Sequence, residues 1–160
     1  MDNLLNKEPV KRAQEYLKKF DENKKIKVLE ETARTAQDAS KALRCEVGAI
    51  VKSLLFRAGD GFILCLVSGD KKCSLNKLKK ITQKNNLCMA TPDEVKTQTG
   101  YTIGGVSPIG HQETLKIMID KSLERFEKIY GAAGHPNCIF RIDFENLIKI
   151  TQGIKEDIIE

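Results

Sequence analysis

A lysine lies among apolar side chains in the stretch GAIVKSLLF, residues 48–56. If this stretch is a β-strand, Lys52 shares one face with large apolar residues, because side chains alternate between the two faces of a strand. Those neighbours are Ile50, Leu54 and Phe56. Burying an ammonium lowers its pKa and costs free energy unless a partner compensates the charge. Lys52 is therefore a candidate functional residue facing a cleft. The alternative is that its ammonium reaches solvent at the end of the strand.

A second unusual segment, TGYTIGGVSPIGH at residues 99–111, is rich in glycine but too apolar for a solvated linker. Gly104 and Gly105 remove side chains at a point where another group must approach the backbone. Pro108 fixes a turn, and Gly110 permits a positive φ. We expect a rigid loop that presents backbone N–H and C=O groups to a ligand, with a tight structural turn as the alternative. The segment matches neither common glycine-rich nucleotide-binding pattern.

The other reactive side chains form no recognisable catalytic or metal-binding set. His135 lies in the turn GAAGHPN (131–137), and His111 ends the glycine-rich segment. Two histidines and scattered carboxylates show no metal-ligand spacing. The five cysteines contain no C-x-x-C pair and several lie in apolar runs, which predicts reduced, structural thiols. A thiol-based redox or transferase activity through Cys45 or Cys138 stays open as an alternative.

Helices and strands must position these residues. Apolar periodicity and end signals predict helices over residues 9–20, 35–43, 74–81, 91–100, 122–130 and from Asp143 to near Gly153. Strands are expected over residues 25–30, 49–56, 62–68, 87–90, 115–120 and 137–142, with a tight turn at RAGDG. Hairpins are mixed with helices, and no long series of β-α-β units is present. We therefore expect a mixed α/β (α+β) fold, with a mixed sheet curled into a distorted, partial barrel and helices outside.

Length and composition limit the class of protein. The 160 residues fit a single domain over 1–160 that needs no disulfide or metal to stabilise its core. The sequence shows neither a signal peptide nor an apolar run of membrane-spanning length, so we expect a cytoplasmic protein. The net charge is +5, and many lysines are clustered. A basic surface suits a polyanion such as nucleic acid, and a simply solvated surface is the alternative.

Four motifs taken together resemble the YbaK/ProX family, the free-standing relatives of the bacterial prolyl-tRNA synthetase editing domain. They are VGAIVKSLLF (47–56), LVSGD (66–70), TGYTIGGVSPIGH (99–111) and GAAGHPN (131–137). The resemblance covers about residues 26–153, preceded by the predicted N-terminal helix. It implies a mixed α/β fold with a distorted central barrel. It also implies hydrolysis of the ester of a mischarged aminoacyl-tRNA, without a metal or organic cofactor.

The resemblance also implies roles for individual residues. Lys52 matches the functional lysine of the family and is the candidate catalytic residue. We expect its ammonium to bind the terminal phosphate of the tRNA or the ester oxygens, with assistance from a ribose hydroxyl of the substrate. The glycine-rich loop and the G-x-P turn line the substrate pocket in the family. The candidate substrate-binding residues are Thr35, Ser53, Gly104, Gly105, Val106, Ser107, Pro108, Gly110 and His135.

The expected substrate is the 3′ end of a mischarged tRNA carrying a small amino acid similar to alanine, serine or threonine, with cysteine also open. Small side chains and Ile or Val surround the glycine-rich loop, and no buried charge is present to select a charged side chain. Some family members have a tyrosine where residues 34–43 have none, and an asparagine where this chain has Ser53. A synthetase is a further candidate partner; DNA and membranes are not. A non-catalytic module of the same fold that binds tRNA or a synthetase is the alternative function.

Overall fold

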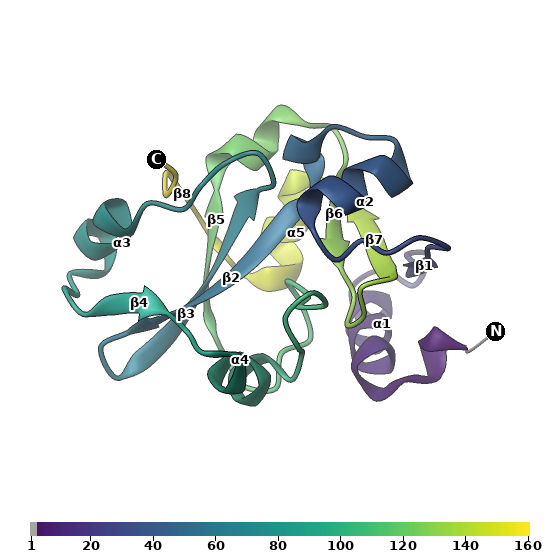
Figure 1. The fold of residues 1–160 in the computed structure, drawn as a ribbon, viewed down its shortest axis with the longest axis horizontal. Coiled ribbons are helices and arrows are strands. Elements are labelled where there is room, and N and C mark those ends of the chain that lie inside the picture. The colour runs from purple at the N-terminus through teal and green to yellow at the C-terminus, as the bar shows by residue number, and fades with distance from the viewer. Residues whose placement is uncertain (1–2) are drawn as a thin grey trace.

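The computed structural model describes residues 3–160, which form five α-helices, three short 3-10 helices and eight strands (Figure 1). The α-helices are α1 (Glu8–Phe20), α2 (Ala36–Leu43), α3 (Leu75–Thr82), α4 (Pro92–Thr99) and α5 (Phe144–Thr151). The 3-10 helices are η1 (Leu4–Asn6), η2 (Val47–Ala49) and η3 (Lys121–Arg125). The strands are β1 (Lys27–Val28), β2 (Val51–Ala58), β3 (Gly61–Ser68), β4 (Leu87–Met89), β5 (Lys116–Asp120), β6 (Ile129–Ala132), β7 (Cys138–Ile142) and β8 (Ile154–Glu156).

The strands form two sheets, which confirms the predicted mixed α/β class. The five-stranded sheet has the order β4-β2-β3-β5-β8, with antiparallel pairing of β2 to β3 and parallel pairing of β3 to β5 and of β5 to β8. The three-stranded sheet is antiparallel, with the order β1-β7-β6. An isolated pairing of Ile50 with Tyr130 connects the start of β2 to β6. Within residues 3–160 the strands do not close into a full barrel; the expected mixed sheet and partial barrel takes the form of two sheets that meet at this pairing.

Strand β2 separates two hydrophobic cores. Val51 and Leu55 belong to the main core, which also contains residues from α1, α5, β3 and β7. Phe56 belongs to a smaller core, to which α3 contributes the buried Leu78 and against which the half-buried Leu54 packs. Burying one such side chain stabilises the fold by about 1.5–3 kcal/mol. The alternation predicted for this strand is therefore confirmed from Val51 onward, and Lys52 begins the face that carries Leu54 and Phe56. The strand does not start at residue 49 as predicted, because residues 47–49 form η2 and Ile50 follows as its C-terminal cap.

The ends of the helices follow the predicted local signals. The hydroxyls of Thr35 and Ser74 cap the N-termini of α2 and α3. Thr91 and Glu94 form a complete capping box at the start of α4, and Asp143 caps α5. Caps of this kind are each worth about 1 kcal/mol to helix stability. The Thr35 cap fixes where α2 starts and where the loop before α2 ends.

The predicted helix over residues 122–130 is wrong. The chain forms η3 and then β6, which pairs with β7 along its whole length. Ile129 and Tyr130 suit a strand, and pairing with a neighbouring strand outweighs the local helical pattern. The strand expected over residues 25–30 is likewise shorter, because only Lys27–Val28 pairs with β7.

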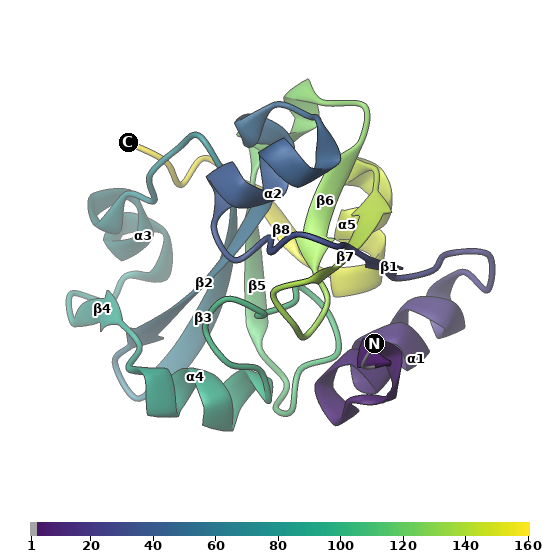
Figure 2. The ribbon, with the colours of Figure 1, turned by 45° about the vertical axis from the view of Figure 1, so that its right-hand side comes forward.

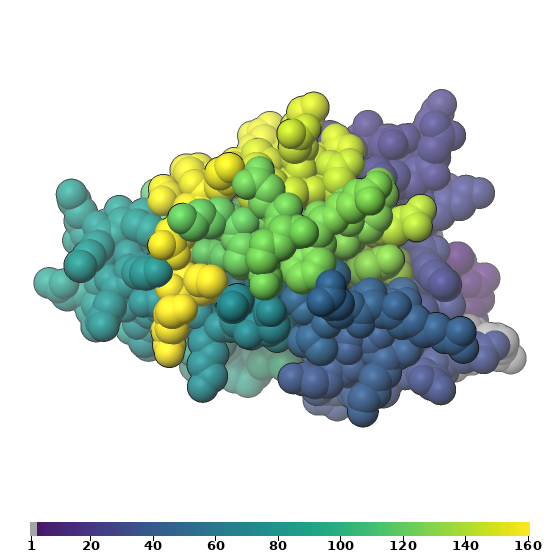
Figure 3. All heavy atoms as spheres, turned by 90° about the horizontal axis from the view of Figure 1, so that it is seen from above, coloured from purple at the N-terminus to yellow at the C-terminus, as the bar shows by residue number. Residues whose placement is uncertain are grey.

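Helices α1 and α3 lie at opposite ends of the molecule, and α2 lies near the start of β2 (Figures 1 and 2). Seen from above, the C-terminal residues (yellow) lie between the α3 region (teal) and the segment around η3 (green) (Figure 3). There the Ser74 N–H donates to the Ile158 carbonyl at 2.7 Å. No helix formed by residues 3–160 has both the length and the apolar character needed to cross a bilayer.

Candidate functional site

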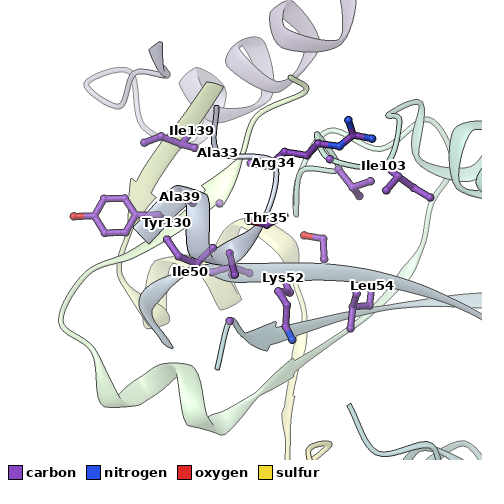
Figure 4. Close-up of a pocket in the computed structure, with 18 of the residues that line it drawn as sticks. Ala33, Arg34, Thr35, Ala39, Ile50, Lys52, Leu54, Ile103, Tyr130 and Ile139 are labelled. Carbon is purple, nitrogen blue, oxygen red and sulfur yellow. The ribbon is translucent and has the colours of Figure 1, made fainter. Parts of the chain in front are cut away.

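A cavity of about 450 Å³ opens where α2, the start of β2, β6 and the glycine-rich loop meet (Figure 4). Most of its wall is formed by alanine, valine, leucine and isoleucine side chains. The polar side chains that line it are Arg34, Thr35, Gln37, Lys52, Ser53 and Tyr130. A concave, mainly apolar cavity of this size with a few polar groups is typical of a small-molecule site.

Three segments far apart in the sequence pack together beside the cavity, and we call them the interlocked loops. They are residues 29–35, which lead into α2, residues 102–107 of the glycine-rich loop, and the turn 133–137 between β6 and β7. The Asn137 carbonyl accepts the Leu29 N–H at 2.7 Å. The Asn137 side-chain amide donates to the Leu29 carbonyl at 3.0 Å. The turn therefore holds the first loop by both backbone and side-chain hydrogen bonds.

Half of the predicted site residues line the cavity, namely Thr35, Lys52, Ser53, Gly104 and Val106. The others lie away from the cavity wall, namely Gly105, Ser107, Pro108, Gly110 and His135. The structure thus brings together residues from the first interlocked loop, from β2 and from the tip of the glycine-rich loop. The second half of the glycine-rich segment has other contacts.

Gly105 and His135 hold the interlocked loops together. The Gly134 N–H donates to the Gly105 carbonyl at 3.0 Å. A Cβ on Gly105 would lie 2.9 Å from the backbone N of His135. The His135 ring is engaged within its own turn, where Nδ1 accepts the Asn137 N–H at 3.0 Å, and burial lowers its pKa. The group that approaches the Gly105 backbone is therefore the turn 133–137.

The end of the glycine-rich segment anchors the loop to α1. Ser107 is fully buried, and its carbonyl accepts a hydrogen bond from Nε2 of His111 at 2.7 Å. Burial lowers the pKa of His111 to about 4, so the ring is neutral at neutral pH. Gly110 has a φ of 70°, and its carbonyl accepts a hydrogen bond from Nε of Arg12 at 2.7 Å. Pro108 and Gly110 line a second cavity of about 360 Å³ instead.

Lys52 points away from the interlocked loops. Figure 4 shows it leaving β2 on the side opposite to Arg34 and Thr35. Its ammonium donates to the carbonyl of Lys71, in the segment that follows β3. Burial lowers the pKa of Lys52, and the nearby Asp70 carboxylate opposes this shift. An ammonium has three N–H groups, so Lys52 keeps donors for a ligand besides the one bound to Lys71.

Ser53 lies on the other face of β2, with Val51 and Leu55. Its Oγ is buried and has no hydrogen-bond partner among residues 3–160. A buried hydroxyl without a partner costs about 1–3 kcal/mol, so it is an uncommon feature that calls for an explanation. The Thr35 hydroxyl accepts the Asp38 N–H at 3.1 Å and can still donate its own proton.

Sequence reasoning missed several residues on this wall. Arg34, Met89, Ile103 and Tyr130 all line the cavity. Ile103 and Met89 are 56% and 55% exposed, which is unusual for large apolar side chains. Arg34 immediately precedes the cap of α2 and belongs to no recognisable motif. The only sequence signal for Arg34 was its position next to Thr35.

This arrangement suits recognition of an anionic or oxygen-rich group next to a small apolar group. Among residues 3–160, the cavity wall has no carboxylate, imidazole or thiol, and no three potential metal-ligating side chains cluster. Its cations, Arg34 and Lys52, come from opposite sides of β2. The half-buried Lys52 ammonium interacts more strongly with negative charge than an exposed cation such as Arg34 does, because less water screens it.

Residues 30–150 match the family model of the aminoacyl-tRNA editing domain. The protein YwhH of Bacillus subtilis, itself uncharacterised, is 32% identical over 134 residues, which cover 83% of this chain and 85% of YwhH. The proline–tRNA ligase of Kosmotoga olearia is 38% identical over 87 residues, 54% of this chain but only 15% of the ligase.

The fold is shared with solved structures. The crystal structure of a protein proposed as a trans-editing enzyme for prolyl tRNA synthetase superposes with a TM-score of 0.90 at 35% identity. That superposition covers 96% of this chain and 98% of the other. The matched region includes the whole cavity wall, which confirms the resemblance predicted from the motifs. This chain belongs to the aminoacyl-tRNA editing domain family.

Proposed function

We propose that this protein is a trans-acting deacylase that hydrolyses the ester between a small amino acid and the 3′ end of a mischarged tRNA. The observation that carries the proposal is the cavity with Lys52 on its wall, in a chain that belongs to the aminoacyl-tRNA editing domain family. A synthetase pocket rejects an amino acid that is smaller by one methylene with only about 1–3 kcal/mol of discrimination. Some tRNA is therefore charged with the wrong amino acid, and a hydrolase of this kind is needed to remove it.

The reaction places few demands on the protein. Water adds to the ester carbonyl, the resulting tetrahedral oxyanion collapses, and the C–O bond to the ribose breaks as the ribose oxygen takes up a proton. We propose that Lys52 is the catalytic residue and that its ammonium donates hydrogen bonds to the ester oxygens as negative charge develops there. Its half-buried position strengthens this interaction, while the cavity holds the ester in place. A ribose hydroxyl of the substrate is the candidate proton carrier.

A small amino acid fits the chemistry of the wall. The side chains that α2 and its preceding loop contribute include Ala33, Ala36 and Ala39, and none of the lining residues carries a negative charge to select a basic side chain. The volume of about 450 Å³ exceeds what alanine or serine alone would fill, and so leaves room for part of the terminal nucleoside. Alanine, serine and threonine are the proposed amino acids, with cysteine as a further candidate.

The proposed carrier is a tRNA charged by prolyl-tRNA synthetase. The support is the likeness to proline–tRNA ligases and to the protein proposed as a trans-editing enzyme for prolyl tRNA synthetase. The synthetase itself is a candidate partner, since a free-standing editing protein must meet the product as it is released.

A deacylation panel tests the proposal. Purified tRNA charged with alanine, serine, threonine, cysteine, proline or a large amino acid is incubated with the wild type, Lys52→Ala and Lys149→Ala. Lys149 is an exposed lysine on α5 that lies off the cavity wall, so its loss should leave hydrolysis unchanged. We expect rapid wild-type hydrolysis of a small aminoacyl ester and a loss of at least about 100-fold in Lys52→Ala, the scale for one oxyanion donor.

Three results would contradict parts of the proposal. Near wild-type hydrolysis by Lys52→Ala would remove Lys52 from catalysis. Hydrolysis restricted to large amino acids would refute the small-substrate assignment. Tight binding of the charged tRNA without any hydrolysis would identify a non-catalytic module of the same fold.

A further inference from the structure

Arg34 is a cation at the opening of the cavity, on the same side of β2 as Thr35 and Ile103 (Figure 4). Its side chain is exposed. Within residues 3–160, the guanidinium has no carboxylate within ion-pairing distance and makes no hydrogen bond. Arg12 and Arg125, by contrast, are engaged with neighbouring carboxylates. The charge of Arg34 is therefore available to a ligand.

The rest of the Arg34 side chain is held in place. A Cβ added to Gly104 would lie 3.1 Å from Cγ and 3.4 Å from Nε of Arg34, so the arginine lies directly on the glycine. Gly104 has a φ of 98°, which side-chain-bearing residues rarely adopt. The preceding residue is also fixed, because the Ala33 N–H donates to the Pro136 carbonyl at 2.6 Å. The interlocked loops thus position the arginine and leave its guanidinium free.

Two further residues on the cavity wall indicate the kind of ligand that Arg34 would bind. Ile103 adjoins Gly104 and exposes 56% of its surface, so an apolar face lies beside the cation. The Lys52 ammonium lies on the opposite side of β2, bound to the Lys71 carbonyl (Figure 4). A ligand that contacts both cations must therefore carry two oxygen-rich groups separated by a compact apolar or ring-containing body.

We propose that Arg34 binds the phosphate on the 5′ side of the terminal nucleotide of the tRNA, and that Ile103 packs against the nucleoside. The inference rests on the proposed function, in which Lys52 binds the ester. The ester is attached to the 2′ or 3′ oxygen of the terminal ribose, and the phosphate to its 5′ oxygen. The two groups leave the sugar at opposite ends, which matches cations on opposite sides of one strand. A guanidinium also matches a phosphate with two parallel hydrogen bonds.

A comparison of two minimal substrates isolates this contact. One is adenosine 5′-monophosphate esterified at the ribose with the amino acid preferred in the deacylation panel. The other is the same ester of adenosine, which lacks the phosphate. We expect Arg34→Ala to lower kcat/KM for the phosphorylated ester by about 10- to 100-fold, the range for a lost charged hydrogen bond. Hydrolysis of the adenosine ester should be unchanged. Arg34→Lys should recover part of the loss, because lysine keeps the charge but not the two-pronged geometry.

Arg141→Ala is the matched control, because Arg141 is an exposed arginine on β7 that lies off the cavity wall. It should hydrolyse both esters like the wild type. Equal losses on both esters in Arg34→Ala, or no loss on either, would overturn the assignment to phosphate. Binding of adenosine 5′-monophosphate and adenosine, measured by NMR titration, gives the same comparison without hydrolysis. The role of Arg34 is thereby tested even if the wild type cleaves no ester.

Discussion

Replacing Gly105 by alanine should force the interlocked loops apart. The added Cβ would lie 2.9 Å from the backbone N of His135 and 3.0 Å from the carbonyl carbon of Gly134. Both neighbours are backbone atoms, so no side-chain rotation can relieve the contact. The loops must separate by about 0.6 Å to restore an ordinary separation of about 3.5 Å. This shift also lengthens the 3.0 Å hydrogen bond between Gly134 and Gly105.

The expected cost follows from these two effects. Overpacking of this kind costs about 1–3 kcal/mol, and weakening one hydrogen bond adds up to about 1 kcal/mol. We therefore expect the free energy of unfolding to fall by about 2–3 kcal/mol, or Tm by about 5–10 °C for a domain of this size. Urea and thermal unfolding followed by circular dichroism measure the loss. Ester hydrolysis should fall as well, since the same loops hold Arg34.

Gly61→Ala is the matched control for this prediction. A Cβ at Gly61 would have its nearest neighbour, the Ala58 carbonyl oxygen, at 3.9 Å. Its stability should therefore stay within about 0.5 kcal/mol of the wild type. If Gly105→Ala is as stable as Gly61→Ala, the close packing of the loops is refuted. Lost hydrolysis with unchanged stability would instead place Gly105 in substrate binding.

Three further predictions concern buried polar groups. Because burial lowers the pKa of Lys52, this residue binds fewer protons in the folded protein than in the unfolded chain between that pKa and 10.5. Lys52 therefore makes stability increase with pH in this window, whereas Tyr101 and Cys138, whose pKa values burial raises, have the opposite effect. The change of stability with pH should be more positive in the wild type than in Lys52→Met, as urea unfolding at alkaline pH would show. Because burial lowers the pKa of His111 from 6.5 to about 4, this residue should cost at most about 3 kcal/mol of stability as the pH falls from 6.5 to 4. His111→Asn should lose correspondingly less stability over this range in urea unfolding, while His135, whose pKa is also lowered, contributes to the loss in both proteins. Ser53→Ala should be at least as stable as the wild type in thermal unfolding, because it removes an unpaired hydroxyl. Ser40→Ala is the control and should lose about 1 kcal/mol of stability, because the Ser40 Oγ donates a hydrogen bond to the Gln37 carbonyl at 2.8 Å. Equal changes in stability for Ser53→Ala and Ser40→Ala would contradict this reasoning.

Local signals in the sequence predicted much of the fold. The cap at Thr35, the capping box at Thr91 and the alternation of β2 depend on residues close together in the chain, and all are found in the structure. The helix predicted over residues 122–130 is wrong because the structure of this segment depends on a partner strand, β7. Its apolar spacing suits a helix, but β7 offers hydrogen bonds to Ile129–Ala132 that a local pattern cannot reveal.

The candidate site was less accessible to sequence reasoning. Lys52 was found because an ammonium among apolar residues is anomalous within a single strand. Which side of β2 faces the interlocked loops depends on how the two sheets are placed, so the separation of Lys52 from Arg34 could not be predicted. Gly104 and Gly105 were expected to be approached closely, but the sequence does not say by what. The approaching groups are Arg34 and the turn 133–137, both distant in the chain.

The interlocked loops also determine when the cavity can form. The hydrogen bond from the Asn137 side chain to Leu29 joins residues 108 positions apart. Closing a loop of that length costs chain entropy before any contact repays it, so these contacts are expected to form late in folding. At a synthesis rate of about 5–20 residues per second, the turn 133–137 is synthesised roughly 5–20 s after the segment that carries Arg34. A nascent chain would therefore remain without a substrate cavity until most of the protein has been synthesised.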